Sequence, residues 1–354
     1  MISGYVFSQK NELIPDSTTL SDSKKMELGF IGGPFYNPER SLGLAAGVVS
    51  LFNLDKKDTL TQPSKAYVIG MGSLVGMYGG NTNLELYLKE DKIRFYQTSQ
   101  LRNMPDYYWG NGFESAGNNE NKEAYQRYNY FVNTKLLFRT IGSLYIGPKF
   151  DINYSNSEPL GTNPLLTQNA DLEYFNSGMG FSLSYDSRDF VGNPFTGLLA
   201  ELNSTYYTTL LGGEYNYHIT EFTFNKYISL KKNKSILAAQ FYSRIATGNV
   251  PFTELSLLGN PYNMRGYYWG RFRDKVYISA QIEYRQKIYK KHGIVLWLGA
   301  GVIGETVNTI DFRNTLPSFG VGYRFEFKKR VNARLDYGVG EDSDGFYFNA
   351  MEAF

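Results

Sequence analysis

The sequence predicts an all-β fold, a transmembrane antiparallel β-barrel of about 16 strands with one long extracellular loop inserted into its lumen. Apolar and polar residues alternate with period two along most of the chain, which is typical of strands that face two different environments. Short turns alternate with long loops, as they do at the two rims of a transmembrane barrel. The composition agrees, because 30 tyrosines, 25 phenylalanines and 36 glycines among 354 residues favour strands and tight turns over helices.

The alternation is clearest in the segment KVYISAQIEYR, residues 275–285. One face is apolar or aromatic and the other is mostly polar or charged. The first face carries Val276, Ile278, Ala280, Ile282 and Tyr284, and the second carries Tyr277, Ser279, Gln281, Glu283 and Arg285. A strand of this kind turns its first set toward lipid and its second set toward a wet lumen.

The same pattern predicts strands throughout residues 27–354. In chain order they are expected at 27–35, 41–52, 65–76, 79–89, 91–101, 125–139, 141–155, 177–188, 196–209, 214–230, 234–247, 274–289, 292–304, 316–328, 331–340 and 345–354. Connections such as KKNK (231–234) and KKR (328–330) are short and basic, whereas 102–124 and 156–176 are long and polar. We expect the short turns at the periplasmic rim and the long loops at the extracellular rim.

A soluble β-sandwich or β-propeller is the alternative all-β fold. Against it, many expected strands are longer than ten residues, their polar face carries charges, and the sequence shows no blade-like repeat. An open sheet of this length would also expose its edges, whereas a barrel closed in lipid has none. A helical membrane protein is excluded, because the most apolar runs, 42–52 and 293–304, are shorter than the roughly 18–20 residues of a spanning helix.

Residues 1–26 form a separate N-terminal segment ahead of the barrel, which is expected over residues 27–354. The stretch MISGYVFSQ (1–9) lacks a basic start and a full apolar stretch. It is either the end of a signal peptide that is cleaved after Gln9 or an ordinary disordered leader. The polar stretch that follows is expected to have no structure of its own.

The first and last strands form an unusual pair. Glycine weakens strand pairing, and proline lacks the amide N–H that a ladder needs. The first strand, ELGFIGGPF, contains Gly29, Gly32, Gly33 and Pro34, and the last strand, GFYFNAMEAF, contains Phe346, Phe348 and Phe354. Because these two strands must meet when the barrel closes, we expect their seam to be the weakest joint in the ring.

The block NPYNMRGYYWGRFRDK, residues 260–275, has neither a strand nor a helix period and lies between two expected strands. Its glycines permit sharp backbone turns, and its aromatic side chains would be buried if the block folded back into the lumen. There Arg265 could meet a carboxylate on the barrel wall. The segment resembles the loop motif of the BamA/TamA family of outer-membrane assembly proteins. The resemblance assigns that motif to Met264, Arg265, Gly266, Tyr267, Gly270 and Arg271.

Three further segments resemble the same family in the same order, so the resemblance covers nearly all of residues 27–354. GPFYNPERSLGLAAG (33–47) resembles its opening hairpin, YDSRDFVGNPFTGLLAELN (185–203) a strand–turn–strand unit, and residues 334–354 its closing hairpin. The chain also ends in an aromatic residue, Phe354, as outer-membrane barrels usually do, although Glu352 departs from the apolar residue expected two positions earlier.

Two further departures affect the interpretation. Family members generally carry periplasmic POTRA domains before the barrel, whereas 26 residues precede the first expected strand here. The loop arginine of the family also usually pairs with an aspartate, and Gly299 stands at the matching position. Arg265 is therefore expected to pair with Glu283 or Asp336 on the lumen face, with Glu326 as a further candidate.

The sequence does not indicate catalytic or metal chemistry. It has no cysteine, and its two histidines, His218 and His292, lie on separate expected strands, which leaves little for a nucleophilic triad or a zinc site. The stretch DSDG (342–345) begins like a calcium loop but lacks the later ligands. A net charge of +2 gives no reason to expect nucleic acid as a partner. We therefore expect no enzyme activity, cofactor or metal.

The resemblance implies a protein of the bacterial outer membrane that assists insertion or translocation of other outer-membrane or surface proteins, with the weak seam as a lateral gate. Its partners would be outer-membrane lipid, unfolded outer-membrane or other envelope proteins and, without POTRA domains, a separate periplasmic receptor or the subunits of a complex. A structural subunit or scaffold that inserts nothing is one alternative, and a passive pore is another.

Overall fold

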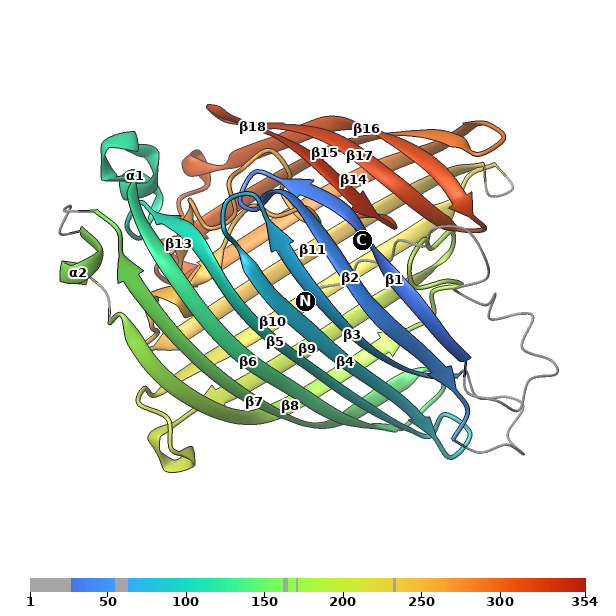
Figure 1. Cartoon of the computed structure of the whole chain (residues 1–354), viewed down its shortest axis with the longest axis horizontal. Coiled ribbons are helices and arrows are strands. Elements are labelled where there is room, and N and C mark those ends of the chain that lie inside the picture. The colour runs from blue at the N-terminus through green and yellow to red at the C-terminus, as the bar shows by residue number, and fades with distance from the viewer. Residues whose placement is uncertain (1–26, 55–62, 162–164, 170, 232–233) are drawn as a thin grey trace.

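The computed structural model describes residues 27–54, 63–161, 165–169, 171–231 and 234–354. The expected N-terminal segment, residues 1–26, lies outside the described residues. Within them the chain forms one closed antiparallel barrel of 16 strands, which confirms the expected fold class (Figure 1). No helix in the described ranges is long and apolar enough to cross a membrane.

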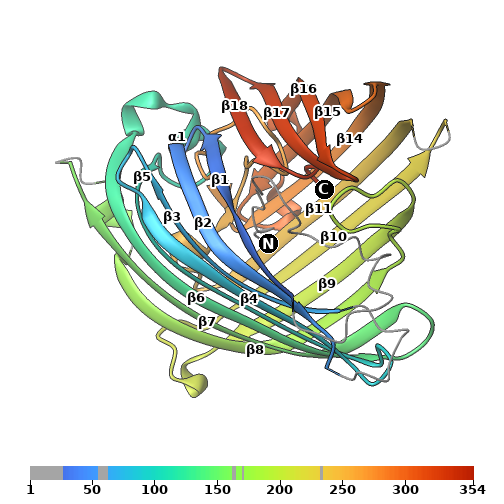
Figure 2. The same ribbon diagram turned by 45° about the vertical axis from the view of Figure 1, so that its right-hand side comes forward.

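The barrel strands follow one another around the ring in chain order, and the first and last are neighbours (Figure 2). They are β1 (Glu27–Asn37), β2 (Ser41–Phe52), β3 (Ser64–Ser73), β4 (Tyr78–Leu88), β5 (Ile93–Tyr108), β6 (Glu123–Arg139), β7 (Leu144–Pro159), β8 (Glu173–Asp186), β9 (Gly197–Tyr207), β10 (Tyr217–Ser229), β11 (Ser235–Gly248), β14 (Val276–Tyr289), β15 (His292–Gly304), β16 (Leu316–Lys328), β17 (Val331–Gly340) and β18 (Ser343–Ala350).

The remaining elements are short and lie in the long connections of one rim. The connection between β11 and β14 contains a small two-stranded sheet, β12 (Ser256–Leu257) with β13 (Arg273–Asp274). The others are α1 (Phe113–Gly117), α2 (Leu165–Asn169), η1 (Asn119–Asn121), η2 (Thr209–Leu211), η3 (Phe252–Glu254), η4 (Val307–Thr309) and η5 (Phe312–Asn314). Most turns of the opposite rim are short, as expected for the periplasmic side, although 53–63 and 187–196 are longer connections.

Most expected strand bounds lie within four residues of the observed ones, and β5 is the exception. It continues seven residues beyond the expected end at 101, because inward-facing residues keep alternating through Met104, Asp106 and Tyr108, and β6 continues alongside them. The last strand was expected at 345–354, but β18 ends at Ala350. Met351 takes a positive φ of 65°, which turns the chain out of the ladder.

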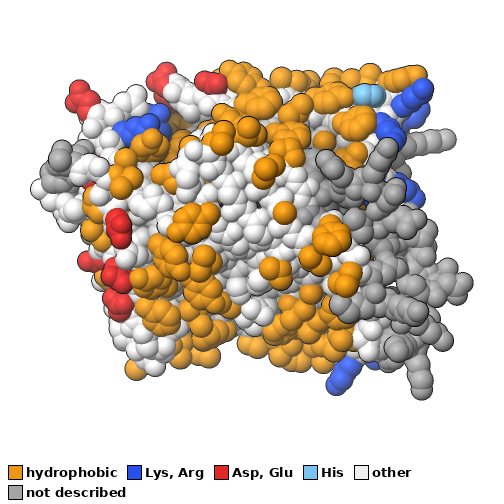
Figure 3. Space-filling view, viewed as in Figure 1, with side chains coloured by type: hydrophobic (Ala, Val, Ile, Leu, Met, Phe, Trp, Pro, Cys, Tyr) orange, Lys and Arg blue, Asp and Glu red, His pale blue; other side chains and the backbone are white. Residues whose placement is uncertain are grey.

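The expected division between lumen and outer faces is observed along β14. Ser279, Gln281 and Glu283 are buried inside the barrel, whereas Ile282 is 55% exposed on the outer wall. On the face shown in Figure 3, the visible aspartate and glutamate side chains lie at the end with the long loops, whereas lysine and arginine are visible at both ends.

Candidate functional site

The connection between β11 and β14, residues 249–275, folds into the barrel and packs against its inner wall. Its buried side chains Leu258, Met264, Tyr267 and Phe272 form one apolar cluster with residues of the wall and of α1. The wall residues are Tyr277, Ile303 and Leu316, and α1 contributes Ala116. We call residues 249–275 the lumen loop. Burial of these large side chains helps to fix the loop inside the barrel.

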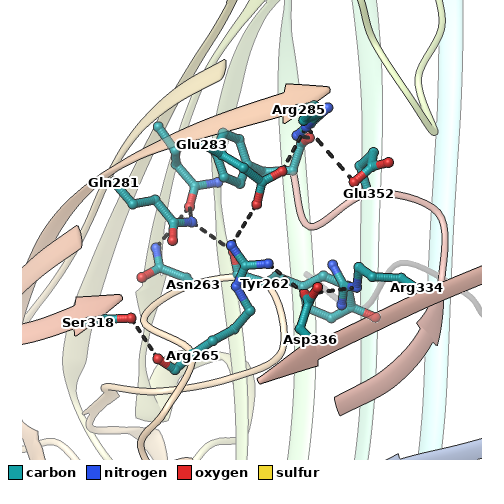
Figure 4. Close-up of polar contacts among 12 residues, drawn as sticks. Tyr262, Asn263, Arg265, Gln281, Glu283, Arg285, Ser318, Arg334, Asp336 and Glu352 are labelled. Carbon is teal, nitrogen blue, oxygen red and sulfur yellow. Dashed lines mark hydrogen bonds and ion pairs between the residues drawn. The ribbon is translucent and has the colours of Figure 1, made fainter. Parts of the chain in front are cut away.

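Arg265 is the centre of the polar contacts that this loop makes (Figure 4). Its Nη2 donates to Glu283 Oε2 on β14 and its Nη1 to Asp336 Oδ2 on β17, both at 2.6 Å. The side chains of all three residues are fully buried. The guanidinium also lies over the Trp297 ring of β15, 3.6 Å from its centroid. One side chain therefore joins three strands through charge-assisted hydrogen bonds and a cation–π contact.

The two carboxylates that receive Arg265 also bond to arginines of the wall. Glu283 Oε1 accepts from Arg285 Nε at 2.7 Å, and Asp336 Oδ1 accepts from Arg324 Nη1 at 2.6 Å. Arg324 Nε donates in turn to Glu352 Oε2 at 2.7 Å, and Arg334 Nη2 donates to the loop carbonyl of Pro261 at 2.9 Å. Such mutual pairing offsets the cost of removing several charges from water.

Gly266 fixes the loop backbone against β17 and β18. Its N–H donates to the Tyr347 hydroxyl at 2.9 Å, and its carbonyl accepts from Ser343 Oγ at 2.5 Å. Its φ is 112°, and a Cβ here would lie 2.7 Å from the Val339 carbonyl carbon. Only glycine fits this close approach of two backbones. Tyr267 adds a hydroxyl bond of 2.6 Å to the Pro317 carbonyl on β16.

The other end of the loop motif contacts the hairpin between β1 and β2. The backbone N–H of Trp269 donates to Glu39 Oε1 at 2.7 Å, and the Arg40 guanidinium lies 5.9 Å from the Trp269 ring centroid. Burial raises the pKa of the Glu39 carboxyl to about 7, although the bond from Trp269 favours its charged form. The lumen loop thus touches both sides of the place where β1 meets β18.

Gly299 and Gly301 on β15 provide space for Met264. A Cβ at Gly299 would lie 3.4 Å from Met264 Sδ and 2.9 Å from Gln281 Cβ, and a Cβ at Gly301 would lie 3.3 Å from Met264 Cε. At the position where members of the BamA/TamA family usually have an aspartate, this chain has Gly299, which leaves space for the side chain of Met264. Asp336 and Glu283 supply the carboxylates instead.

The remaining motif residues lie at the extracellular end of the loop. Gly270 has a φ of 83°, which suits glycine, and its N–H donates to the Leu258 carbonyl. Arg271 Nε donates to the Ala116 carbonyl of α1 at 3.0 Å.

Glu326, a candidate partner of Arg265, does not contact it. Its carboxylate pairs with Lys287 at the periplasmic end of the wall, at 2.7 Å.

Pairing between β1 and β18 is much shorter than any other pairing in the ring. β1 pairs with β2 along its whole length, from Glu27↔Leu51 to Asn37↔Ser41. Among the described residues, β1 and β18 share a single register position, Tyr36↔Phe348. Gly29, Gly32, Gly33 and Pro34 all precede this position in β1, and Phe346 lies beside it, with its ring 5.9 Å from that of Tyr36.

Phe354 does not belong to this seam, which corrects the sequence-based assignment. After β18 the chain turns into the lumen, where the Phe354 carbonyl accepts from Arg285 Nη2 at 2.8 Å. Its ring lies 6.4 Å from that of Tyr227 on β10. Glu352 joins the arginine network described above, so a polar residue at this position has a partner in Arg324. The charge of Glu352 explains why this segment turns inward instead of extending a lipid-facing strand.

Sequence reasoning did not find several residues that hold the loop. Trp297, Arg324, Tyr347 and Glu39 lie far from the loop motif in the chain, and their contacts depend on how the strands are arranged around the ring. Arg324 could have been found from the sequence, because it and Asp336 are oppositely charged residues expected to face inward on neighbouring strands. No group of three or more His, Asp or Glu that could hold a metal ion occurs in the part of the chain that the structure describes.

Comparison with known proteins identifies the family. The family model described as the Omp85 superfamily domain matches residues 22–354. The chain belongs to the Omp85 superfamily. This agrees with the BamA/TamA resemblance and identifies the chain as a barrel of the bacterial outer membrane. Omp85 barrels mediate the insertion or translocation of outer-membrane proteins. No curated protein matches the sequence.

Solved structures show how this Omp85 barrel compares with others. A crystal structure of BamA from Haemophilus ducreyi lacking POTRA domains 1–3 matches with a TM-score of 0.63 at 13% identity, covering 93% of this chain and 71% of that chain. CdiB from Acinetobacter baumannii matches with a TM-score of 0.61 at 11% identity, covering 93% and 60%, and CdiB from Escherichia coli with 0.56 at 10%, covering 94% and 64%. This chain thus spans less than two thirds of either CdiB chain.

Proposed function

We propose that this barrel inserts or translocates other outer-membrane or surface proteins by parting β1 from β18. The observation that carries the proposal is the single register position between these strands, Tyr36↔Phe348, in a ring whose other joints pair over most of their strands. Membership of the Omp85 superfamily supports the general activity. A joint with few backbone hydrogen bonds costs the least free energy to open.

Parting of the seam would make the N–H and C=O groups of two strand edges accessible to an incoming strand within the membrane. Such groups are costly without partners in lipid, and an incoming strand can satisfy them by β-augmentation. β1 stays attached to β2 along its length, so it would remain an ordered template. Pro34 and the neighbouring glycines limit how strongly β1 can pair with β18 again, which favours exchange of partners.

The lumen loop would control this opening because it is fixed to both sides of the seam. On the β16–β18 side it is held by the bonds of Gly266 and Tyr267 and by the Arg265 network. On the β1–β2 side the polar contact is the bond from Trp269 N–H to Glu39. We infer that the loop stays with β16–β18 while the β1–β2 hairpin moves away, since the fewest bonds then break.

The partners in this proposal are outer-membrane lipid and unfolded outer-membrane or envelope proteins. A separate periplasmic receptor, or the subunits of a larger complex, would deliver them. Depletion of the protein in its native cell, followed by quantitative proteomics of the outer membrane, tests the activity. We expect a set of barrel or surface proteins to fall while their transcripts stay constant. If only one or two companions that copurify with the barrel are lost, the protein is a scaffold and the proposal is wrong.

A further inference from the structure

The outer wall carries an aromatic corner at the periplasmic ends of β14, β15 and β16. Tyr289 is 61% exposed and Tyr323 is 40% exposed, both on the outer surface of the barrel. His292 joins them, with its Nδ1 2.5 Å from the Tyr323 hydroxyl and its ring 5.4 Å from that of Phe325. Amphipathic aromatic rings at the end of a lipid-facing band mark the boundary between acyl chains and headgroups.

Two lysines form the turn directly beside this corner. Lys290 and Lys291 connect β14 to β15, and both are exposed. The Lys290 ammonium lies 5.0 Å from the Tyr289 ring centroid. The carboxylate of Glu326 on β16 pairs with Lys287 at 2.7 Å and also attracts Lys291. This stretch of the rim thus carries three lysines, Lys287, Lys290 and Lys291, against the one carboxylate of Glu326. The excess positive charge favours an anionic ligand here.

The outer wall next to the corner shows which anion fits. The outward-facing side chains next along β15 and β16, away from the periplasmic rim, are Ile294, Leu296 and Val321. All three are apolar and exposed to the bilayer. A ligand here must combine a negatively charged head with an apolar tail, because it contacts the lysines and this band at the same time.

We propose that Tyr289, Lys290, Lys291, His292 and Tyr323 form a binding site for the headgroup of an anionic phospholipid in the periplasmic leaflet. The lysine ammonium groups bind the phosphate, His292 and the tyrosine hydroxyls bond to headgroup oxygens, and the aromatic rings lie against the glycerol and upper acyl carbons. This inference does not depend on the proposed insertion activity, because a barrel with any function could hold such a lipid.

A second periplasmic turn provides a matched control. The turn between β4 and β5 also carries two lysines, Lys89 and Lys92, but it contains Glu90 and Asp91 as well. Lys92 Nζ lies 3.0 Å from Glu90 Oε2, and Asp91 pairs with Arg94 at 2.7 Å. Glu90 and Asp91 thus offset two of the three cations Lys89, Lys92 and Arg94, and we expect no preference for anionic lipid there.

The test compares lipid retention by the purified barrel in micelles supplied with equal amounts of phosphatidylglycerol and phosphatidylcholine, measured by native mass spectrometry. We expect the wild type to retain phosphatidylglycerol preferentially. The double variant Lys290→Glu/Lys291→Glu should reduce this preference by about five-fold for each lysine. Lys89→Glu/Lys92→Glu, which makes the same change in charge, should leave it unchanged. Heat-modified mobility on gels verifies that each variant is folded.

Several outcomes would overturn the proposal. One is no lipid preference in the wild type, and another is an equal loss in both double variants. Competition by soluble glycerol 3-phosphate as effective as that by the lipid would mean that the corner binds a free phosphate. An unchanged lipid preference in Lys290→Glu/Lys291→Glu, with loss of a copurifying acidic protein, would assign the corner to a protein partner. Tyr289→Ser keeps the charge and should still weaken lipid retention, which separates the aromatic contribution from the electrostatic one.

Discussion

The β16–β18 side of the barrel makes two contacts, one with β1 and one with the lumen loop, and different interactions hold each of them together. Toward β1, β18 contributes one register position of strand pairing. Toward the lumen loop, the same side contributes the carboxylate of Asp336, the hydroxyls of Tyr347 and Ser343, and the Pro317 carbonyl. Backbone pairing between β1 and β18 therefore contributes little to closing the ring here. Side chains that bind the inserted loop contribute more. This arrangement permits a seam that is weak in pairing and still closed.

The largest expected effect comes from Arg265→Ala, which removes the centre of the stronger contact. Glu283 and Asp336 would each lose a buried charged partner, so the free energy that holds the loop in the lumen should fall by about 3–5 kcal/mol. Limited proteolysis of the folded protein should then cut within the lumen loop. Arg313→Ala, which removes an arginine that is 90% exposed beside Asp311, should change nothing. A loop that stays protected without Arg265 would show that the apolar cluster alone holds it.

Glu39→Gln tests the hydrogen bond from Trp269 N–H to Glu39, which holds the loop to the β1–β2 hairpin. The folded-state pKa of about 7 lies above the unfolded value near 4.5, so the folded state holds the extra proton between these values. Wild-type stability should therefore fall as pH rises from about 4.5 to about 7, by up to roughly 3 kcal/mol. Unfolding midpoints of Glu39→Gln measured over this range should show a flatter profile. Glu120→Gln, at an exposed position, should keep the wild-type profile, and parallel profiles for all three proteins would refute this role of Glu39.

Gly299→Ala should disturb the packing under the loop. Its Cβ would lie 2.9 Å from Gln281 Cβ and 3.4 Å from Met264 Sδ, so β15 or the loop must shift. We expect a loss of about 1–3 kcal/mol in urea unfolding of the micelle-bound protein. Gly117→Ala in α1, where a new Cβ has nothing within 4 Å, is the control. Equal midpoints for the two variants would mean that Gly299 is not needed to seat Met264.

The smallest effect is expected for Tyr347→Phe, which removes one hydroxyl. The buried Gly266 N–H would lose its acceptor at a cost of about 1–2 kcal/mol, and the ring would still fit. Hydrogen exchange at Gly266 should become faster. Tyr337→Phe, on the outer face of the adjacent strand, should leave that exchange rate unaltered. Unchanged exchange in Tyr347→Phe would indicate another acceptor for Gly266.

The sequence predicted the features that depend on local pattern. Alternation along each strand gave the lumen face of β14, and with it Glu283, because side-chain direction in a strand follows from position alone. The same alternation predicted too early an end for β5. Beyond residue 101 the inward-facing residues include apolar ones such as Met104 and Tyr108, so the two faces of the strand differ less in polarity.

Features that depend on contacts between distant strands were predicted less well. Trp297 and Arg324 approach Arg265 and Asp336 only through the curvature of the closed wall. Phe354 was placed in the last strand on its residue type, whereas Met351 turns the chain inward and Glu352 is bound by Arg324. A buried ion pair two residues from the end outweighs the preference of one aromatic side chain for lipid.

The central claim is that β1 and β18 must part for the protein to act. Because the native chain has no cysteine, a disulfide between Tyr36→Cys and Phe348→Cys, which face each other in the register, can lock the seam. Tyr36→Cys with Leu42→Cys ties β1 to β2, which are already paired, and serves as the control. We predict that cells with the oxidised seam lock lose the envelope proteins that depend on this barrel, that a reductant restores them, and that the control supports normal levels. Normal levels with the seam fully locked would contradict the account.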